Sequence, residues 1–243
     1  PLPDTTLPLA FTYAELSENA GWKAQLEAVE RLSRMGSVTP NLLLGLYTQQ
    51  KPAASGGVWD RVAAFQALDA AITAKDQAQI EATLPKAWEK MTEARLEVPF
   101  ATIFGPALAG FALSPEAQAI SVQVMLLSPQ YETLIQGMSP QDAQQAFLLA
   151  LARGSLQGVT APDALDAAIA SAFVTPTLPA DLQARLDQGQ IGQAILAAMT
   201  QMRQGEAGDL RAVTEGLSTL RHLGLEDVAR RSALQLVLLK RLL

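Results

Sequence analysis

The chain has 243 residues, of which 49% are apolar and 17% charged, and its formal net charge is −6. This length allows one large domain or two small ones. The 18 Lys and Arg residues are scattered, which argues against nucleic-acid binding, and the lack of cysteine excludes disulfides, thiolate metal sites and cysteine nucleophiles.

Alanine and leucine are the commonest residues and favour helices, whereas the residues that favour strands are sparse. The sequence therefore predicts an all-α fold with small side chains at many helix crossings. Residues 1–12 hold three prolines and show no helical periodicity. We expect an extended N-terminal arm or the end of a linker there, and a chain that is the C-terminal part of a longer, processed protein.

Cap and turn residues divide the first half of the chain into helices. Gly36 ends the first of them, and Thr39-Pro40 opens the second, because proline fits the first helical turn. Residues 51–57 give the strongest loop signal. An interior proline kinks or splits a helix, so Pro85 divides the fourth helix or bends it. The predicted helices span 19–35, 39–50, 58–74 and 77–96.

Serine followed by proline marks three later helix starts, at Ser114, Ser128 and Ser139. The serine hydroxyl caps the helix, and a nearby acidic residue suits its positive end. Residues 161–163 and 178–181 resemble these starts. Four glycines are expected to end helices or form turns: Gly154, Gly189, Gly205 and Gly224. The last two helices are predicted at 208–223 and 225–242.

These signals predict about 11–13 short helices, with residues 13–243 forming a single all-α domain. No fixed repeat period emerges, and no window carries the tetratricopeptide pattern. Paired short helices nevertheless favour a solenoid-like array of helical hairpins. A compact irregular α-bundle is the alternative.

Residues that carry catalysis are scarce. His222, the one histidine, lies at a predicted helix end, where it suits the negative terminus. One histidine and no cysteine argue against zinc and iron sites, and no phosphate-binding, dinucleotide-binding or EF-hand motif is present. The acid pairs Glu27–Glu30 and Asp163–Asp166 are interpreted as solvated helix faces. The sequence therefore predicts no enzyme, no cofactor and no metal.

The predicted stack of Ala-rich helices resembles the superhelical non-catalytic region of soluble lytic transglycosylases. The likeness is architectural. The catalytic domain of that family carries a Glu-Ser pair, and no Glu-Ser dipeptide occurs in this chain. The resemblance implies a cell-envelope scaffold at most.

One segment, residues 47–61, combines a Gly-Gly turn with aromatic and charged side chains. Loops that present such groups on a rigid scaffold often carry binding, and Trp, Tyr and Arg are enriched at binding hot spots. The alternative is that Trp59 is a core residue with a polar flank. The predicted binding residues are Tyr47, Lys51, Trp59, Asp60 and Arg61.

The C-terminal helix is predicted to be apolar around most of its circumference, so it is either buried or covered by a partner. The interface residues that this predicts are Leu236, Leu239, Leu242 and Leu243. A modest basic cluster in the same region is interpreted as solvated helix surface. Its members are Arg221, Arg230, Arg231, Lys240 and Arg241.

The function expected from these features is a non-enzymatic scaffold or adaptor that binds another protein. One alternative is a binder of lipid or another hydrophobic small molecule, in a cavity lined by Met35, Met125, Met138, Met199 and Met202. Another is an accessory or catalytic domain that acts on cell-wall glycans through paired carboxylates. No apolar run approaches the roughly 18 residues of a membrane helix. The missing initiator methionine, the lack of cysteine and the proline-rich start favour a bacterial periplasm or envelope, with the cytoplasm as the alternative.

Overall fold

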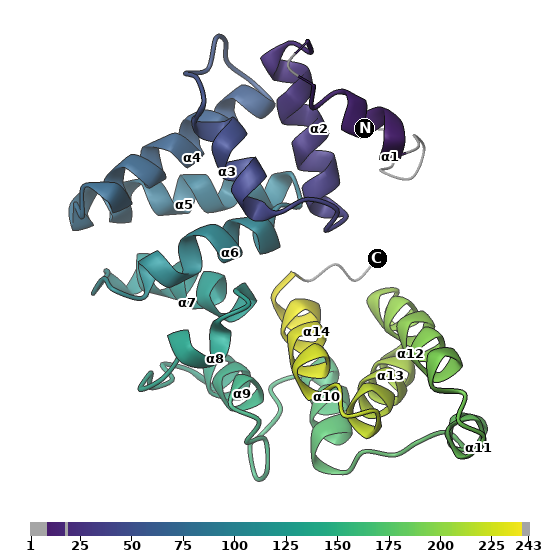
Figure 1. The fold of residues 1–243 in the computed structure, drawn as a ribbon. Coiled ribbons are helices and arrows are strands. Elements are labelled where there is room, and N and C mark those ends of the chain that lie inside the picture. The colour runs from purple at the N-terminus through teal and green to yellow at the C-terminus, as the bar shows by residue number, and fades with distance from the viewer. Residues whose placement is uncertain (1–8, 18, 240–243) are drawn as a thin grey trace. The chain divides into compact units, whose positions relative to one another are not determined.

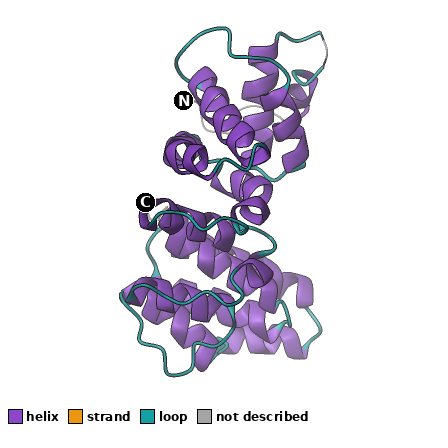
Figure 2. Cartoon of the chain, turned by 90° about the vertical axis from the view of Figure 1, so that its left-hand side faces the viewer, coloured by secondary structure: helices purple, strands orange, loops and turns teal. Residues whose placement is uncertain are grey.

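The computed structural model describes residues 9–17 and 19–239, in which all regular structure is helical (Figure 2). Fourteen helices, α1–α14, follow one another in these residues (Figure 1). The all-α prediction is therefore confirmed. The count exceeds the expected range because it includes two very short helices, α1 with six residues and α8 with four.

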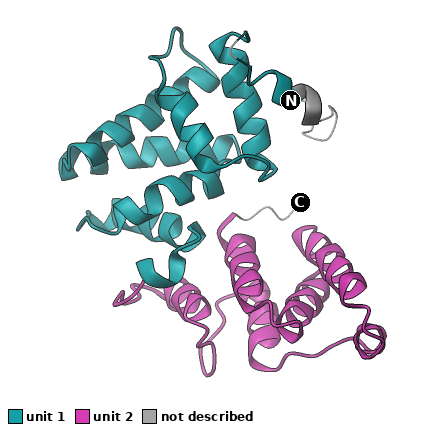
Figure 3. Cartoon of the chain, viewed as in Figure 1, with its two compact units in different colours: residues 1–134 teal, residues 135–243 magenta. Residues whose placement is uncertain are grey.

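The chain divides into two compact units, residues 1–134 and residues 135–243 (Figure 3), where we expected one domain from residue 13 onwards. Unit 1 contains α1 (Leu9–Ala14), α2 (Trp22–Arg34), α3 (Pro40–Thr48), α4 (Val58–Thr73), α5 (Gln77–Glu93), α6 (Glu97–Leu108), α7 (Pro115–Leu127) and α8 (Tyr131–Leu134). Unit 2 contains α9 (Ala143–Ala152), α10 (Ala164–Val174), α11 (Ala180–Asp187), α12 (Ile191–Glu206), α13 (Leu210–His222) and α14 (Glu226–Leu239).

Helix α1 begins at Leu9, inside the segment that we expected to be extended. Residues 9–12 are therefore helical, whereas residues 1–8 lie outside the described part of the chain. The helix packs against α2, and the Tyr13 hydroxyl donates to the carbonyl of Ser37 at 2.5 Å. These contacts are tertiary, which is why local periodicity did not indicate the helix.

Aspartate side chains cap four helices. Asp76, Asp142, Asp163 and Asp209 each accept a hydrogen bond from a backbone N–H in the first turn of the helix that follows, at 2.7–3.1 Å. The predicted serine cap at Ser114 makes no such bond, although α7 does begin at the following proline. Serine and aspartate are comparably good caps, so residue preference alone could not choose between them.

Two prolines lie inside helices. Pro85 is exposed in α5, which runs unbroken from Gln77 to Glu93, so this proline does not divide the helix. Pro106 lies in the last turn of α6. Local sequence patterns predict no helix over 97–108, because two prolines and a glycine obscure the periodicity there.

Unit 1 contains a cluster of aromatic rings that includes residues of α3, α4 and α6. The Phe65 ring of α4 lies 5.0 Å from the Tyr47 ring of α3 and 4.8 Å from the Phe104 ring of α6, measured between centroids. Phe100 of α6 lies 4.8 Å from Phe104. Tilted and edge-on arrangements of this kind are the favourable ones for aromatic pairs. The cluster joins α3, α4 and α6.

Unit 2 contains a close crossing of α12 and α13 at glycines. A Cβ atom at Gly205 would lie 2.6 Å from Val213 Cγ2, and one at Gly216 would lie 3.3 Å from the carbonyl oxygen of Ala198. Gly205 was expected to end a helix, but it lies inside α12 because the crossing needs a residue without a side chain. Sequence neighbours also pack together in the pairs α4–α5 and α6–α7 (Figure 1). A solenoid arrangement of such pairs stays a prediction.

Candidate functional site

The segment predicted to bind, residues 47–61, runs from the end of α3 through an exposed loop into the first turn of α4. Two of its five predicted residues, Tyr47 and Arg61, come together on a third residue that the sequence analysis did not select. That residue is Glu30 of α2, which is buried. We call Glu30, Tyr47 and Arg61 the Glu30 centre.

The carboxylate of Glu30 is held from both neighbouring helices. The Tyr47 hydroxyl donates to Glu30 Oε1 at 2.6 Å. Arg61 donates through Nε to Oε1 at 2.8 Å and through Nη2 to Oε2 at 2.7 Å, in the two-pronged geometry that arginine favours with carboxylates. Arg34, one turn along α2, lies 3.9 Å from Oε2. The Glu30 centre thus joins α2, α3 and α4.

The surroundings of Tyr47 and Arg61 in the Glu30 centre raise the pKa of each side chain. Burial raises the pKa of Tyr47 well above its ordinary value, and the Glu30 carboxylate raises it further. Burial lowers the pKa of Arg61, but the hydrogen bonds and the charge of Glu30 outweigh this effect and raise it overall. The tyrosine therefore stays neutral and the arginine charged at physiological pH. A buried carboxylate held by a neutral tyrosine and a charged arginine suits a structural role better than proton transfer.

The other predicted binding residues lie around the loop and not in the Glu30 centre. Trp59 is half-buried, and its ring lies 5.2 Å from that of Trp22, whose indole N–H donates to the carbonyl of Leu46 at 2.9 Å. Asp60 accepts from the backbone N–H of Gly56 at 2.9 Å, which fixes the loop to α4. Lys51 is exposed. Binding at this segment stays a prediction.

The interpretation of Glu27 and Glu30 as one solvated face is wrong for Glu30. Glu27 is exposed and lies 3.4 Å from Lys23, whereas Glu30 is buried. A signal was available, because Glu30 is four residues after Leu26 and next to Val29, on the apolar face of the helix. Its arginine partner, thirty-one residues further on, could not be identified from the sequence.

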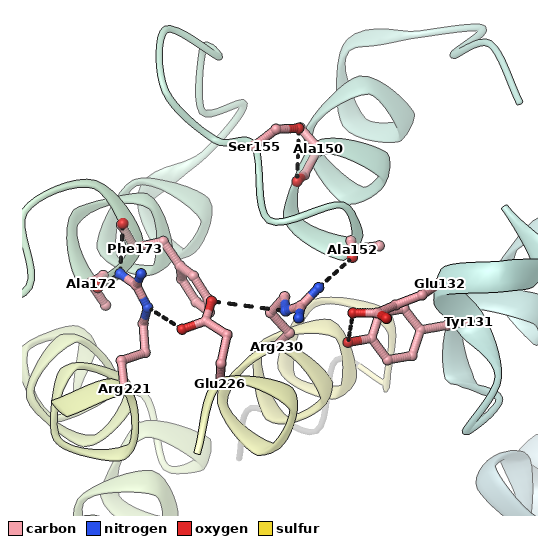
Figure 4. Close-up of polar contacts among 10 residues, drawn as sticks. All are labelled: Tyr131, Glu132, Ala150, Ala152, Ser155, Ala172, Phe173, Arg221, Glu226 and Arg230. Carbon is pink, nitrogen blue, oxygen red and sulfur yellow. Dashed lines mark hydrogen bonds and ion pairs between the residues drawn. The ribbon is translucent and has the colours of Figure 1, made fainter. Parts of the chain in front are cut away.

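The predicted solvated cluster near the C-terminus contains two arginines that instead join helix ends within unit 2 (Figure 4). Arg221 donates to the carbonyls of Ala172 and Phe173 at the end of α10, at 2.9 and 2.6 Å. It also donates to Glu226 at 2.8 Å. Arg230 donates to the last carbonyl of α9 at 3.1 Å. Cations at the negative ends of helices are stabilising, so these two arginines hold the unit together.

The rest of that basic cluster gives a mixed outcome. Arg231 is partly exposed and lies 3.7 Å from Asp227, one turn earlier on α14, as expected for a helix surface. Lys240 and Arg241 lie outside the described residues. The solvated-surface interpretation is therefore wrong for Arg221 and Arg230, because neither side chain is directed mainly to water.

Unit 2 also buries an acid that was predicted to be solvated. Asp166, in the first turn of α10, is fully buried. No donor lies within normal hydrogen-bond distance and angle of either of its carboxylate oxygens. Burial, followed by the charge of Asp163, raises the pKa of Asp166 to about 6. Three residues earlier, Asp163 is exposed and caps the helix, as a solvated residue does.

The predicted interface on α14 is only partly accessible. Leu236 is buried and Leu239 is half-buried, whereas Leu242 and Leu243 lie outside the described residues. Three large exposed apolar side chains of unit 2 gather elsewhere, on α12, where Ile191, Leu196 and Met199 are 55%, 64% and 57% exposed. Val174 of α10 and Val228 of α14 are also exposed. The surface on α12 was not predicted.

Two of the five methionines proposed to line an internal cavity face solvent. Met35 and Met199 are both exposed. Among the described residues, no helix has the length and apolar character needed to span a membrane. In the same residues, no three acidic or histidine side chains are grouped as a metal ion would require.

Comparison of the chain with protein-family models, with curated proteins and with solved structures gives no match. The proposals below therefore rest on the geometry of the chain.

Proposed function

We propose that this protein is a non-enzymatic helical scaffold that binds a partner protein through the exposed face of α12. The observation that carries the proposal is the inverted arrangement of side-chain sizes on this helix. Its buried residues are the small ones, Ala194, Ala198 and Gly205, which face the close crossing with α13. Three of its large apolar side chains, those of Ile191, Leu196 and Met199, are exposed.

The exposed side chains form a continuous stripe. Ile191, Ile195 and Met199 follow one another at four-residue spacing, which places them on one face of a helix, and Leu196 lies beside them. Ile195 is half-buried and the other three are exposed. Apolar residues scattered singly over a surface are ordinary, but a contiguous set marks an interaction site.

The stripe suits an amphipathic helix from another protein. A helix that docks by its apolar face recognises anchors spaced three or four residues apart, as this stripe presents them. Charged residues follow the stripe at the end of α12, where Arg203 and Glu206 are exposed. A polar rim around an apolar centre is the usual composition of such an interface.

The experiment compares tagged full-length chains carrying Leu196→Glu, Met199→Glu or the control Gln204→Glu. All three positions are exposed on α12, and Gln204 lies on its polar side. Proteins that co-purify are quantified by mass spectrometry, and circular dichroism checks the fold. We expect the first two variants to lose one specific partner about tenfold or more, because apolar anchors dominate such interfaces.

The control is expected to retain the partner at the level of the unchanged chain. Equal retention by all three variants would contradict the proposal. So would equal loss in all three, because that result would place the contact elsewhere on α12.

A further inference from the structure

The buried carboxyl group of Asp166 is unusual for this chain, because most of its acidic residues are exposed or paired. We propose that Asp166 is a pH-responsive switch within unit 2, which holds the first turn of α10 in place when neutral and loosens it when ionised. The proposal is independent of the binding surface on α12.

The geometry gives the ionised form of Asp166 little compensation. Asp166 is fully buried, and neither oxygen accepts a hydrogen bond of normal geometry. Gln144, near the start of α9, favours the charged form to some degree, but less strongly than burial opposes it. Removing an unpaired charge from water is costly, so such a group takes up a proton instead.

A second acid strengthens the effect. Asp163 caps α10 by accepting from the backbone N–H of Asp166 at 2.8 Å, which fixes its carboxylate beside the same helical turn. Its negative charge opposes a second negative charge at Asp166. Burial and this like charge act in the same direction.

The charged residues on the packed helices have partners away from Asp166. On α13, which packs against α10, Arg211 pairs with Glu215, and His222 contacts the carbonyl of Ser218. Arg221, also on α13, binds carbonyls at the opposite end of α10. On α14, Glu226 pairs with Arg221 and Arg230, Arg230 also binds the end of α9, and Arg231 pairs with Asp227. On and beside α9, Asp142 caps the helix and Arg153 donates to the carbonyls of Ile135 and Met138.

The sign of the response follows from the raised pKa. A carboxyl that titrates near pH 6 when folded, against its ordinary value of 3.8, binds its proton more tightly in the closed state. The first turn of α10 is therefore held in place most strongly below about pH 4. This stabilisation weakens as the pH rises to about 6 and stays low at higher pH. The difference between these two pKa values corresponds to a change of up to about 100-fold in the opening equilibrium.

The direct test is a carbon-13 NMR titration of the side-chain carboxyl groups in the full chain, from pH 3 to pH 8. We expect Asp166 to titrate near pH 6 in the unchanged chain and at lower pH in the Asp163→Asn variant. Asparagine keeps a capping oxygen but removes the charge. A midpoint for Asp166 below about 4.5 in the unchanged chain would overturn the proposal.

Amide hydrogen exchange tests whether ionisation of Asp166 loosens the first turn of α10. The exchange rates are corrected for the intrinsic pH dependence of amide exchange. Between pH 4.5 and pH 7.5, protection of the first turn of α10 is expected to fall at least tenfold in the unchanged chain. The neutral variant Asp166→Asn is expected to lose this dependence, whereas Asp142→Asn, an exposed cap of the same kind on α9, is expected to keep it. An identical fall in the unchanged chain and in Asp166→Asn would contradict the proposal, as would no fall in the unchanged chain.

Discussion

At the scale of single residues, the Glu30 centre shows what a buried charge requires. The carboxylate of Glu30 is acceptable inside unit 1 because Arg61 and Tyr47 together supply three hydrogen bonds to it. Breaking such a pair leaves an uncompensated charge behind, which costs more than the pair itself contributes.

The Glu30→Gln variant is therefore expected to lower the free energy of unfolding by about 2–3 kcal/mol, since Arg61 loses its counter-charge. Tyr47→Phe removes one hydrogen bond to the carboxylate and is expected to cost about 1–2 kcal/mol. Denaturant titration of the full chain measures both changes. The exposed pair Lys86–Glu89 supplies the control, because Glu89→Gln is expected to leave stability almost unchanged. A Glu30→Gln chain as stable as the unchanged one would contradict this role.

Residue-level prediction from the sequence succeeded only in part. Tyr47 and Arg61 were selected because their residue types are common in binding sites, yet the structure places them on Glu30 in a structural contact. Glu30 and Asp166 were both assigned to solvated faces, because acidic residues are seldom buried. Their burial depends on helices distant in sequence, and no local pattern contains that information.

At the scale of helices, the crossing of α12 and α13 depends on the absence of side chains at two glycines. A Cβ atom at Gly205 would meet Val213 at 2.6 Å, and one at Gly216 would meet the Met202 sulfur at 3.0 Å. Both Gly→Ala variants are expected to destabilise unit 2, Gly205→Ala by about 1–3 kcal/mol because the branched valine cannot move aside without shifting its backbone.

Gly192, on the exposed side of α12, is the matched control. A Cβ atom there would meet nothing within 4 Å. Alanine favours the helix over glycine, so Gly192→Ala is expected to stabilise the chain by about 0.5–1 kcal/mol. Thermal melting of the three variants distinguishes these outcomes. Equal destabilisation by all three would show that the crossing is not as close as described.

Helix caps give a second test at this scale. Asp209 accepts from the backbone N–H groups of Arg211 and Ala212 at 3.0 and 3.1 Å, whereas the Ser114 side chain makes no capping bond. Asp209→Ala is expected to cost about 1 kcal/mol, and Ser114→Ala much less. Equilibrium unfolding of the two variants checks the difference, and the reverse order would contradict the assignment of the caps.

Most helices were predictable, because their punctuation is local. The glycine stops at Gly154, Gly189 and Gly224 adopt positive φ angles of 68°, 74° and 74°, which glycine tolerates at a helix end. Helices α1 and α6 were missed. The first is short and packs through tertiary contacts, and the second contains prolines that tertiary packing outweighs.

At the scale of the whole molecule, the features that suggest function are unequally distributed between the two units. Unit 1 builds an aromatic core and a compensated polar centre. Unit 2 is held by close glycine packing and arginine-capped helix ends, and it leaves the large apolar side chains of α12 exposed. This exposed stripe supports the proposal of a scaffold that binds another protein.

The most direct measurement is site-specific photo-cross-linking of the full chain in its native cells, with the photoreactive amino acid at Leu196 or at Gln204. Both positions are exposed on α12, one in the apolar stripe and one on the polar side. We expect a defined protein adduct from position 196 and none from position 204. Adducts with lipid alone from position 196, or the same protein adduct from both positions, would contradict the proposed binding surface on α12.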